Sequence, residues 1–362
     1  MPSMLPQVRS TLSNARPAGW EVSGGPRHLP SKSGKIRPVT EASDRRSQVR
    51  ATKAPAIVPP PIGRTVETSS GLTFERVPGQ AVDFPIDSHM HTAFSPDSHL
   101  LLELHAAQAA AYGIREIAIT DHVDFLPGAP AYRYFDYDVR RRVIADFAER
   151  WAGKVRIRHG VEITYESRFE DEIRDYLASH DFEYAIGSVH AVKDSPYTKA
   201  NVAAFAEGRT VAEAVAPYFA EVEKAIRSGL FDTIGHLDQC KRWLRPWFPV
   251  EAFRTIPEAY ERLLEPLAGN GTALEVNSSG LRYPEHETYP AAWVVARFRE
   301  LGGERVTVGS DAHVPTSFAF GLEEAAEIVA AAGFSRLTLE RAIDRRDLVL
   351  PERFLDPKVG RA

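Results

Sequence analysis

The residues of this chain best suited to chemistry are histidines and carboxylates that follow short apolar segments. Imidazole and carboxylate groups are common ligands of divalent metals. Because seven segments lead into such residues, the repetition predicts a polynuclear metal hydrolase. The donor-bearing segments are Asp87–His91, Thr120–His122, Gly160–Glu162, Ser188–His190, Gly235–Asp238, Glu275–Asn277 and Ser310–His313.

Two of these segments carry donors two residues apart. On an extended strand, His89 and His91 would project to the same side, and so would Asp311 and His313. Glu162 is the only acid in its strand-like stretch, and a buried carboxylate needs a cation or hydrogen-bond donors. Its two oxygens could bridge two metal ions.

Three further histidines, His122, His190 and His236, occupy the corresponding place after other strand-like stretches. A lone buried histidine is more often a packing residue than a ligand, but the recurrence at one position favours a ligand role. The remaining histidines lie away from these positions, and we expect them on the surface or in packing. They are His28, His99, His105, His159, His180 and His286.

These donors require elements that bring the ends of many strands together. Helix-like segments, such as 100–112 before Gly113 and 211–228 before Gly229, separate the strand-like ones. Seven alternations predict a parallel α/β barrel with the metal site at the C-terminal ends of its strands. The predicted strands lie near 84–88, 115–120, 155–163, 183–189, 231–235, 273–277 and 305–310.

Composition narrows the class of protein. The chain has 362 residues, 43% hydrophobic and 26% charged, with a formal charge of −5, which disfavours a protein built to coat nucleic acid. No apolar run approaches the length of a membrane span or a signal-peptide core. The single cysteine, Cys240, excludes intramolecular disulfides, and we expect a cytoplasmic protein in which this thiol is a small buried side chain.

The two ends of the chain differ from its middle. Residues 1–78 are rich in Pro, Ser, Arg and Gly and show no periodicity, which predicts a disordered basic tail. A transit peptide is the alternative, although the segment lacks an amphipathic pattern. We expect the barrel to span residues 79–350 and a short C-terminal tail to span 351–362.

The motifs, in this order, resemble those of the PHP (polymerase and histidinol phosphatase) superfamily, and within it the monofunctional histidinol-phosphatases. The resemblance runs from Ile86 to Gly321. Two motifs, His89–Thr92 and Gly309–His313, are family-wide, and two others, Ile186–His190 and Phe231–Asp238, are more discriminating. The stretch Glu275–Arg282, followed by Glu287–Pro290, resembles the phosphatase branch in particular.

The resemblance implies a distorted (β/α)7 barrel that holds three divalent ions, of zinc, manganese or iron. Members of this family carry His or Asp at the sixth residue after the paired histidines, where this chain has Asp97. The implied ligands are His89, His91, Glu162 and Asp311 for one ion, Glu162, His190 and His236 for a second, and Asp97, His122 and His313 for the third.

The implied activity is hydrolysis of a small phosphate monoester, with L-histidinol phosphate as the best single substrate. A metal-bridging hydroxide would attack phosphorus in line. Glu162 and Asp311 would act in catalysis, and Asp311 could also protonate the leaving alkoxide. Arg282 is the first candidate for a catalytic residue that binds the phosphate, because a planar guanidinium can donate two parallel hydrogen bonds to phosphate oxygens. Further candidate phosphate contacts are Lys241, Arg242 and Arg133.

Two other functions stay open at this point. The first is a nucleotide phosphatase or exonuclease of the same superfamily, although an acidic barrel offers no basic track for a nucleic-acid strand. The second is a non-catalytic metal-binding regulatory module whose basic tail contacts nucleic acid. The complete donor set argues against it.

Overall fold

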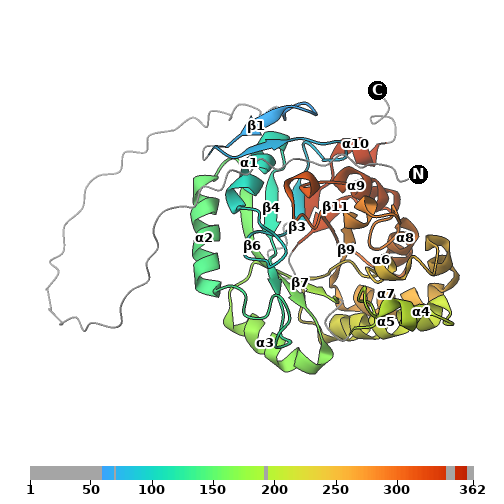
Figure 1. Cartoon of the computed structure of the whole chain (residues 1–362). Helices are drawn as coiled ribbons and strands as arrows, with labels where there is room; N and C mark the ends of the chain where they lie inside the picture. Colours follow the sequence, from blue (N-terminus) through green and yellow to red (C-terminus); the bar gives the residue numbers. More distant parts are fainter. Residues whose placement is uncertain (1–58, 69–70, 191–194, 340–346, 357–362) are drawn as a thin grey trace, which may run out of the picture. The chain divides into compact units, whose positions relative to one another are not determined.

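The computed structural model describes residues 59–68, 71–190, 195–339 and 347–356 (Figure 1). Its central feature is a parallel sheet in the order β10-β9-β8-β7-β6-β4-β3, with β5 paired to β6. The strands are β3 (Ile86–Met90), β4 (Glu116–Ile119), β5 (His122–Val123), β6 (Arg156–Thr164), β7 (Tyr184–Ser188), β8 (Thr233–Ile234), β9 (Ala273–Asn277) and β10 (Val306–Gly309).

The two outermost strands of this order, β3 and β10, meet and bring the sheet close to a closed barrel. Met90 forms a parallel bridge with Ala312. The backbone N–H of His91 donates to Ala312 O at 2.9 Å, and that of Asp311 donates to His89 O at 2.8 Å. The seven predicted strands are present, and β5 adds a two-residue strand after β4. The prediction of a distorted (β/α)7 barrel is confirmed.

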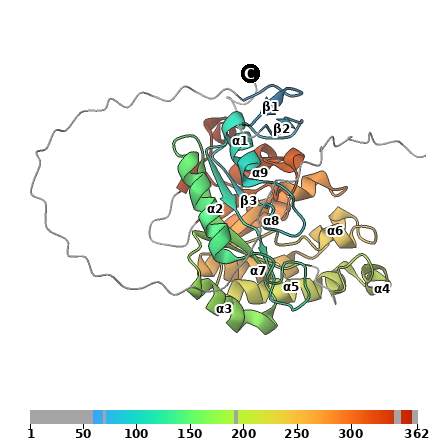
Figure 2. The same ribbon diagram turned by 60° about the vertical axis from the view of Figure 1, so that its left-hand side comes forward.

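Helices surround the strands, as Figure 1 and the rotated view in Figure 2 show. They are α1 (Leu102–Tyr112), α2 (Tyr137–Arg150), α3 (Glu170–Ser179), α4 (Val202–Ala206), α5 (Val211–Ser228), α6 (Lys241–Leu244), α7 (Pro257–Asn270), α8 (Ala292–Glu300), α9 (Leu322–Ala331) and α10 (Glu352–Leu355). Short 3-10 turns are η1 (Ser167–Phe169), η2 (Val250–Thr255), η3 (Ser278–Arg282) and η4 (Pro315–Ser317).

Local sequence signals determine where several of these helices begin and end. Thr210 and Glu213 form a capping box at the start of α5. Gly113 and Gly229 end α1 and α5 in the left-handed conformation, at φ of 73° and 66°. Helices on the outside of parallel strands bury both faces of the sheet, so strand side chains such as Ile117 are fully buried. In the described part of the chain, no helix is both long and apolar enough to cross a bilayer.

The expected N-terminal tail is ordered where the structure describes it. Strands β1 (Thr65–Glu67) and β2 (Thr73–Glu75) form an antiparallel hairpin. Phe74 is buried, and its ring lies 5.9 Å from that of Tyr112. The prediction of disorder is therefore wrong for the described residues of 59–78, because three-residue strands carry too little periodicity to detect. Residues 1–58 lie outside the described part.

The C-terminal end likewise contains more structure than expected. Strands β11 (Arg336–Thr338) and β12 (Asp347–Val349) form a second hairpin. In α10, the ring of Phe354 lies 6.0 Å from that of Phe84, and Arg353 donates a hydrogen bond to Val82 O at 2.8 Å. Residues 351–356 of the predicted tail are thus packed on the barrel, and 357–362 lie outside the described part.

Candidate metal centre

The nine predicted metal ligands meet at the carboxyl ends of the barrel strands. Eight of the donors lie near or just after the ends of six strands, and Asp97 comes from the loop between β3 and α1. The donors are His89 and His91 at β3, His122 in β5, Glu162 in β6, His190 after β7, His236 after β8, Asp311 and His313 after β10, and Asp97.

Glu162 lies at the centre of this group and is fully buried. Its Oε2 lies 3.2 Å from His89 Nε2, 3.4 Å from His91 Nε2 and 2.9 Å from His122 Nδ1. Its Oε1 lies 3.2 Å from His190 Nε2 and 2.9 Å from His236 Nε2. The two oxygens thus face two different sets of imidazoles.

Asp97 and His313 occupy the outer side of the group. Asp97 Oδ2 lies 3.3 Å from His313 Nε2 and 3.5 Å from His122 Nε2, and the Asp97 side chain is 55% exposed. Asp311 is positioned between the two sides, because its Oδ1 lies 3.3 Å from His91 Nε2 and 3.4 Å from His313 Nδ1. The group therefore runs from a closed interior to the surface.

The donor set fits divalent metal ions. His89 Nε2, His91 Nε2 and Glu162 Oε2 are buried and have no hydrogen-bond partner among the described residues. A buried polar atom without a partner costs free energy, which a cation would recover. Three groups have ligand atoms that all lie within 4.8 Å of one another, and they are His89–His91–Glu162, His91–His122–His313 and His122–Glu162–His190.

The electrostatics of the group centre on Glu162. Burial alone would raise the pKa of its carboxyl, but the charges of His89, His190 and His122 lower that pKa well below its usual value. Burial, together with the neighbouring His313 and His122, lowers the pKa of His91 to about 3. The first effect keeps a carboxylate and the second keeps a neutral imidazole, and these are the forms that bind metals.

Hydrogen bonds orient several of the donor rings from behind. His91 Nδ1 lies 3.1 Å from Ser95 Oγ, and His190 Nδ1 lies 2.8 Å from Thr164 Oγ1. His89 Nδ1 lies 2.7 Å from a carboxylate oxygen of Glu275. Each contact leaves Nε2 of the same ring turned toward the donor group, as second-layer contacts in metal sites do.

Two further buried carboxylates hold the backbone around the donors. Asp87 accepts a hydrogen bond from the backbone N–H of Ser310 at 2.9 Å and from that of Ala319 at 3.1 Å. Asp121 accepts one from Thr92 N at 2.6 Å, and Arg140 Nε lies 2.8 Å from it. Asp87 and Asp121 were noted in the motifs without a role, and Arg140 was missed because nothing local marks a buried arginine on an otherwise polar helix.

The structure changes the interpretation of the predicted phosphate contacts. Lys241 is buried, and its ammonium lies 3.0 Å from Asp238 Oδ2 and 3.4 Å from Glu287 Oε2. Because these carboxylates neutralise it, we no longer expect Lys241 to bind phosphate. Arg242 is exposed, and its guanidinium lies 4.0 Å from the centroid of the Tyr283 ring.

Arg282 supports a ligand-bearing loop. It donates to the carbonyl oxygens of Ser310 and Asp311, at 2.7 Å and 3.1 Å. Asp311 has a left-handed backbone with φ of 54°, which is strained for a residue other than glycine. The Arg282 guanidinium therefore stabilises the unfavourable backbone conformation of Asp311, a candidate metal ligand.

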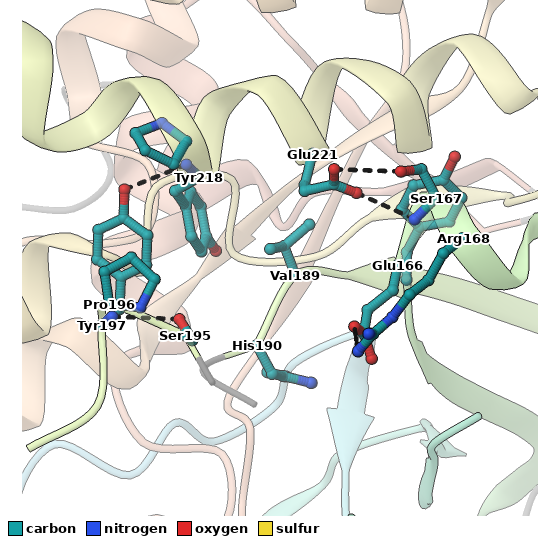
Figure 3. Close-up of a pocket in the computed structure, with 12 residues that line it drawn as sticks. Glu166, Ser167, Arg168, Val189, His190, Ser195, Pro196, Tyr197, Tyr218 and Glu221 are labelled. Atoms are coloured by element: carbon teal, nitrogen blue, oxygen red, sulfur yellow. Dashed lines mark hydrogen bonds and ion pairs between the residues drawn. The ribbon is translucent and has the colours of Figure 1, made fainter. Parts of the chain in front are cut away.

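A cavity of about 380 Å³ adjoins His190 (Figure 3). Helix α5 forms one wall with Tyr218 and Glu221, and Tyr197 and the pair Glu166–Arg168 lie at its sides. A second cavity, of about 750 Å³, is lined by Arg133 among other residues of the 123–137 segment. The first of these cavities could receive a small organic group next to the metal ligands.

Comparisons with known proteins agree with this geometry. The PHP domain family matches residues 87–279. The "Probable histidinol-phosphatase" of Deinococcus radiodurans is 32% identical over 70% of this chain and 95% of its own length. The histidinol-phosphatase of Lactococcus lactis is 28% identical over 70% of this chain and 93% of its own.

A solved structure extends the likeness to three dimensions. Histidinol phosphate phosphatase from Lactococcus lactis, in complex with zinc, L-histidinol and phosphate, superposes with a TM-score of 0.63 at 26% identity. The match covers 72% of this chain and 98% of that one. The family match, the curated relatives and the shared fold agree with the strand-end motifs. The chain therefore belongs to the PHP domain family and, within it, to the histidinol-phosphatase branch.

Proposed function

We propose that this protein is a metal-dependent phosphatase that hydrolyses L-histidinol phosphate to L-histidinol and phosphate. The observation that carries the proposal is the Glu162-centred group, in which five imidazoles surround one buried carboxylate. Two relatives named as histidinol-phosphatases align with this chain over almost their whole length. This similarity supports L-histidinol phosphate as the substrate. The bound L-histidinol and phosphate of the Lactococcus lactis structure support it further.

We infer that the group holds three divalent ions of zinc, manganese or iron. Nitrogen and oxygen donors without sulfur suit all three metals. Glu162 would bridge two ions through its two oxygens, with His89, His91 and Asp311 on one side and His190 and His236 on the other. Asp97, His122 and His313 would hold the third. Bound ions would supply a nucleophile by lowering the pKa of water and would neutralise phosphoryl oxygens.

The chain's own residues then position the reacting groups. Asp311, held by Arg282 through the carbonyls of residues 310 and 311, keeps its carboxylate beside His91. The cavity beside His190 would receive the alcohol half of the ester, with Tyr197 and Tyr218 as its apolar wall. Such positioning lowers the entropic part of the barrier before any bond changes.

We expect the enzyme to act in the cytoplasm, because hydrolysis of histidinol phosphate belongs to amino-acid biosynthesis. The lone Cys240 fits a reducing compartment, since it offers no intramolecular disulfide.

The test is phosphate release by the metal-replete protein from L-histidinol phosphate and from a panel of nucleotide and sugar phosphates. We expect kcat/KM for histidinol phosphate to exceed that of every other ester by at least about tenfold. A nucleotide hydrolysed equally well would overturn the substrate assignment. No release from any ester, with metals bound, would overturn the enzymatic role. Elemental analysis of the same sample tests the number and identity of the ions.

A further inference from the structure

We propose that Glu275 is a positioning residue that sets the orientation of two metal-ligand histidines, His89 and His236. The inference rests on the proposed ligand set. Glu275 lies in β9 and is fully buried. Glu275 belongs to the donor-bearing segment Glu275–Asn277, but the sequence assigned it no role.

The two carboxylate oxygens of Glu275 have different partners. Oε1 lies 2.7 Å from His89 Nδ1. Oε2 accepts a hydrogen bond from the backbone N–H of His236 at 2.7 Å and one from Asn277 Nδ2 at 3.1 Å. Both oxygens are thus occupied by N–H groups, so Glu275 acts behind the ligands and is not a ligand itself.

The contact with His89 determines which ring nitrogen can bind a metal. A carboxylate only accepts hydrogen bonds, so a proton on His89 Nδ1 is held by Glu275. Nε2 of the same ring points toward Glu162 Oε2, 3.2 Å away, and it is the nitrogen that would be left to bind a metal ion. Glu275 therefore selects the tautomer that a metal ligand requires.

The contact with His236 acts on the backbone. His236 has a positive φ of 23°, a conformation that side-chain-bearing residues rarely adopt. Its N–H is held by Glu275, while its Nε2 lies 2.9 Å from Glu162 Oε1. Because His89 faces one oxygen of Glu162 and His236 faces the other, a single outer carboxylate orients ligands of two different ions.

Gly309 leaves part of the space that this carboxylate occupies. A Cβ at Gly309 would lie 2.6 Å from Glu275 Oε1 and 2.4 Å from His89 Cβ. The end of β10 therefore has room for the Glu275–His89 contact only because residue 309 has no side chain.

The decisive variant is Glu275→Gln. Two N–H donors, from His236 and Asn277, hold the amide oxygen on their side, so the amide NH2 faces His89 Nδ1. His89 must then accept at Nδ1 and carry its proton on Nε2, which blocks the metal-binding lone pair. We expect the dissociation constant for zinc, measured by competition with a chelator, to rise about 10- to 100-fold. Because the ligands themselves remain, saturating zinc should restore most of kcat.

The matched control is Glu116→Gln, which removes another buried carboxylate, on β4, whose partner is Arg158. Its zinc affinity should equal that of the wild type. Thermal unfolding of the metal-free proteins reports whether each variant folds. If Glu275→Gln does not fold, Glu275→Asp keeps the charge but withdraws the carboxylate by one methylene, and weaker zinc binding is expected there too.

Wild-type zinc affinity in a folded Glu275 variant would overturn the positioning role. That result would leave the proposed function intact, because wild-type phosphate release is measured separately. Conversely, a wild type that binds zinc but releases no phosphate would overturn the function, and the affinity comparison would still decide the role of Glu275.

Discussion

Glu162 and Glu116 are buried carboxylates on paired strands of one barrel, and their partners are of different kinds. Glu162 lies near the carboxyl end of β6 among five imidazoles. Glu116 is the first residue of β4 and forms an ion pair with the fully buried Arg158. Burial is similar at the two positions, so the partner decides what each carboxylate can do.

The two carboxylates differ in the source of the positive charge that neutralises them. For Glu116 it is a side chain of the protein, and for Glu162 it can be a bound cation. Arg158 keeps its charge at every physiological pH, so Glu116 is neutralised permanently and serves the fold. Imidazoles bind metals in their neutral form, so Glu162 and its neighbours can together hold cations taken from solution. A buried acid thus indicates a metal site only where its neighbours are themselves ligands.

Removal of the metals should have the largest effect of all on activity, because it acts on the group around Glu162. It should leave the ion pair between Glu116 and Arg158 unchanged. We expect a chelator to abolish phosphate release, and added zinc or manganese to restore it. Because ions bind the folded state, each should stabilise it by about 2.7 kcal/mol at about 100 times its Kd. Phosphate release and thermal unfolding, with and without chelator, check this. Full activity in the metal-free protein would refute the comparison.

The pH dependence of metal binding provides a sharper form of the same test. Burial alone would lower the pKa of His89 and His122, but the nearby Glu162 carboxylate raises both well above their ordinary value. Metal must therefore displace protons from these two rings, so metal affinity should fall as the pH is lowered from above neutrality, and binding should release protons at about pH 7. Calorimetric titration in buffers of different ionisation enthalpy measures this release. An affinity that is constant from about pH 8 to pH 5.5 would contradict a histidine-based site.

Replacement of the central carboxylate should be nearly as severe as metal removal. Glu162→Gln removes the negative charge and keeps the shape of the side chain. Replacement of a residue that only contacts the ligands typically lowers activity up to about 100-fold, and the loss of turnover in Glu162→Gln should be larger. Bound metal should also decrease, as elemental analysis would show. Near wild-type turnover in the metal-replete variant would exclude the bridging role of Glu162.

A change at the outer side of the group should cost less. The Asp97 side chain is 55% exposed and contacts His122 and His313, so it is not enclosed as Glu162 is. We expect Asp97→Asn to lower kcat/KM by about tenfold and to lose the third ion first during stepwise chelation. Asp97→His should retain more activity than Asp97→Asn, because imidazole is also a ligand. Equal losses for Asp97→Asn and Glu162→Gln would remove the distinction between inner and outer donors.

Replacement of Glu116 should have the smallest effect on activity. Glu116→Gln removes the carboxylate charge that faces the buried Arg158, which should lower the free energy of unfolding by about 3 kcal/mol. The folded variant should keep wild-type kcat and metal content. Chemical denaturation measures the first quantity and steady-state kinetics the second. A loss of metal in this variant would show that the two ends of the strands are not independent.

Much of this site could be predicted from the sequence. Eight of the nine donors are recognisable because ligand type and strand periodicity are local properties and these donors lie at the ends of apolar stretches. Asp97 lies in a loop, and only the family resemblance implied it. His89 and His91 are the simplest case, since their spacing alone places both on one side of a strand. The barrel followed from the same repetition, because parallel strands bring their carboxyl ends together.

Other features depended on contacts between distant segments. Lys241 and Arg282 have the same chemistry as phosphate-binding residues, and only the structure shows Asp238 beside one and the carbonyls of Ser310 and Asp311 beside the other. The hairpin of β1 and β2 escaped detection because it is stabilised by pairing and by the burial of Phe74, not by its own periodicity.

The sequence by itself determined which residues could bind metal and on which strands they lie. Only the tertiary structure decided which carboxylate lies among five imidazoles and which contacts a histidine ring and the backbone of another from behind, as Glu162 and Glu275 show. Both are acids within fully buried stretches of parallel strands, so no local pattern separates them. The physical reason is that a buried charge takes its role from its neighbours in space, and closure of the barrel brings those neighbours from remote parts of the chain.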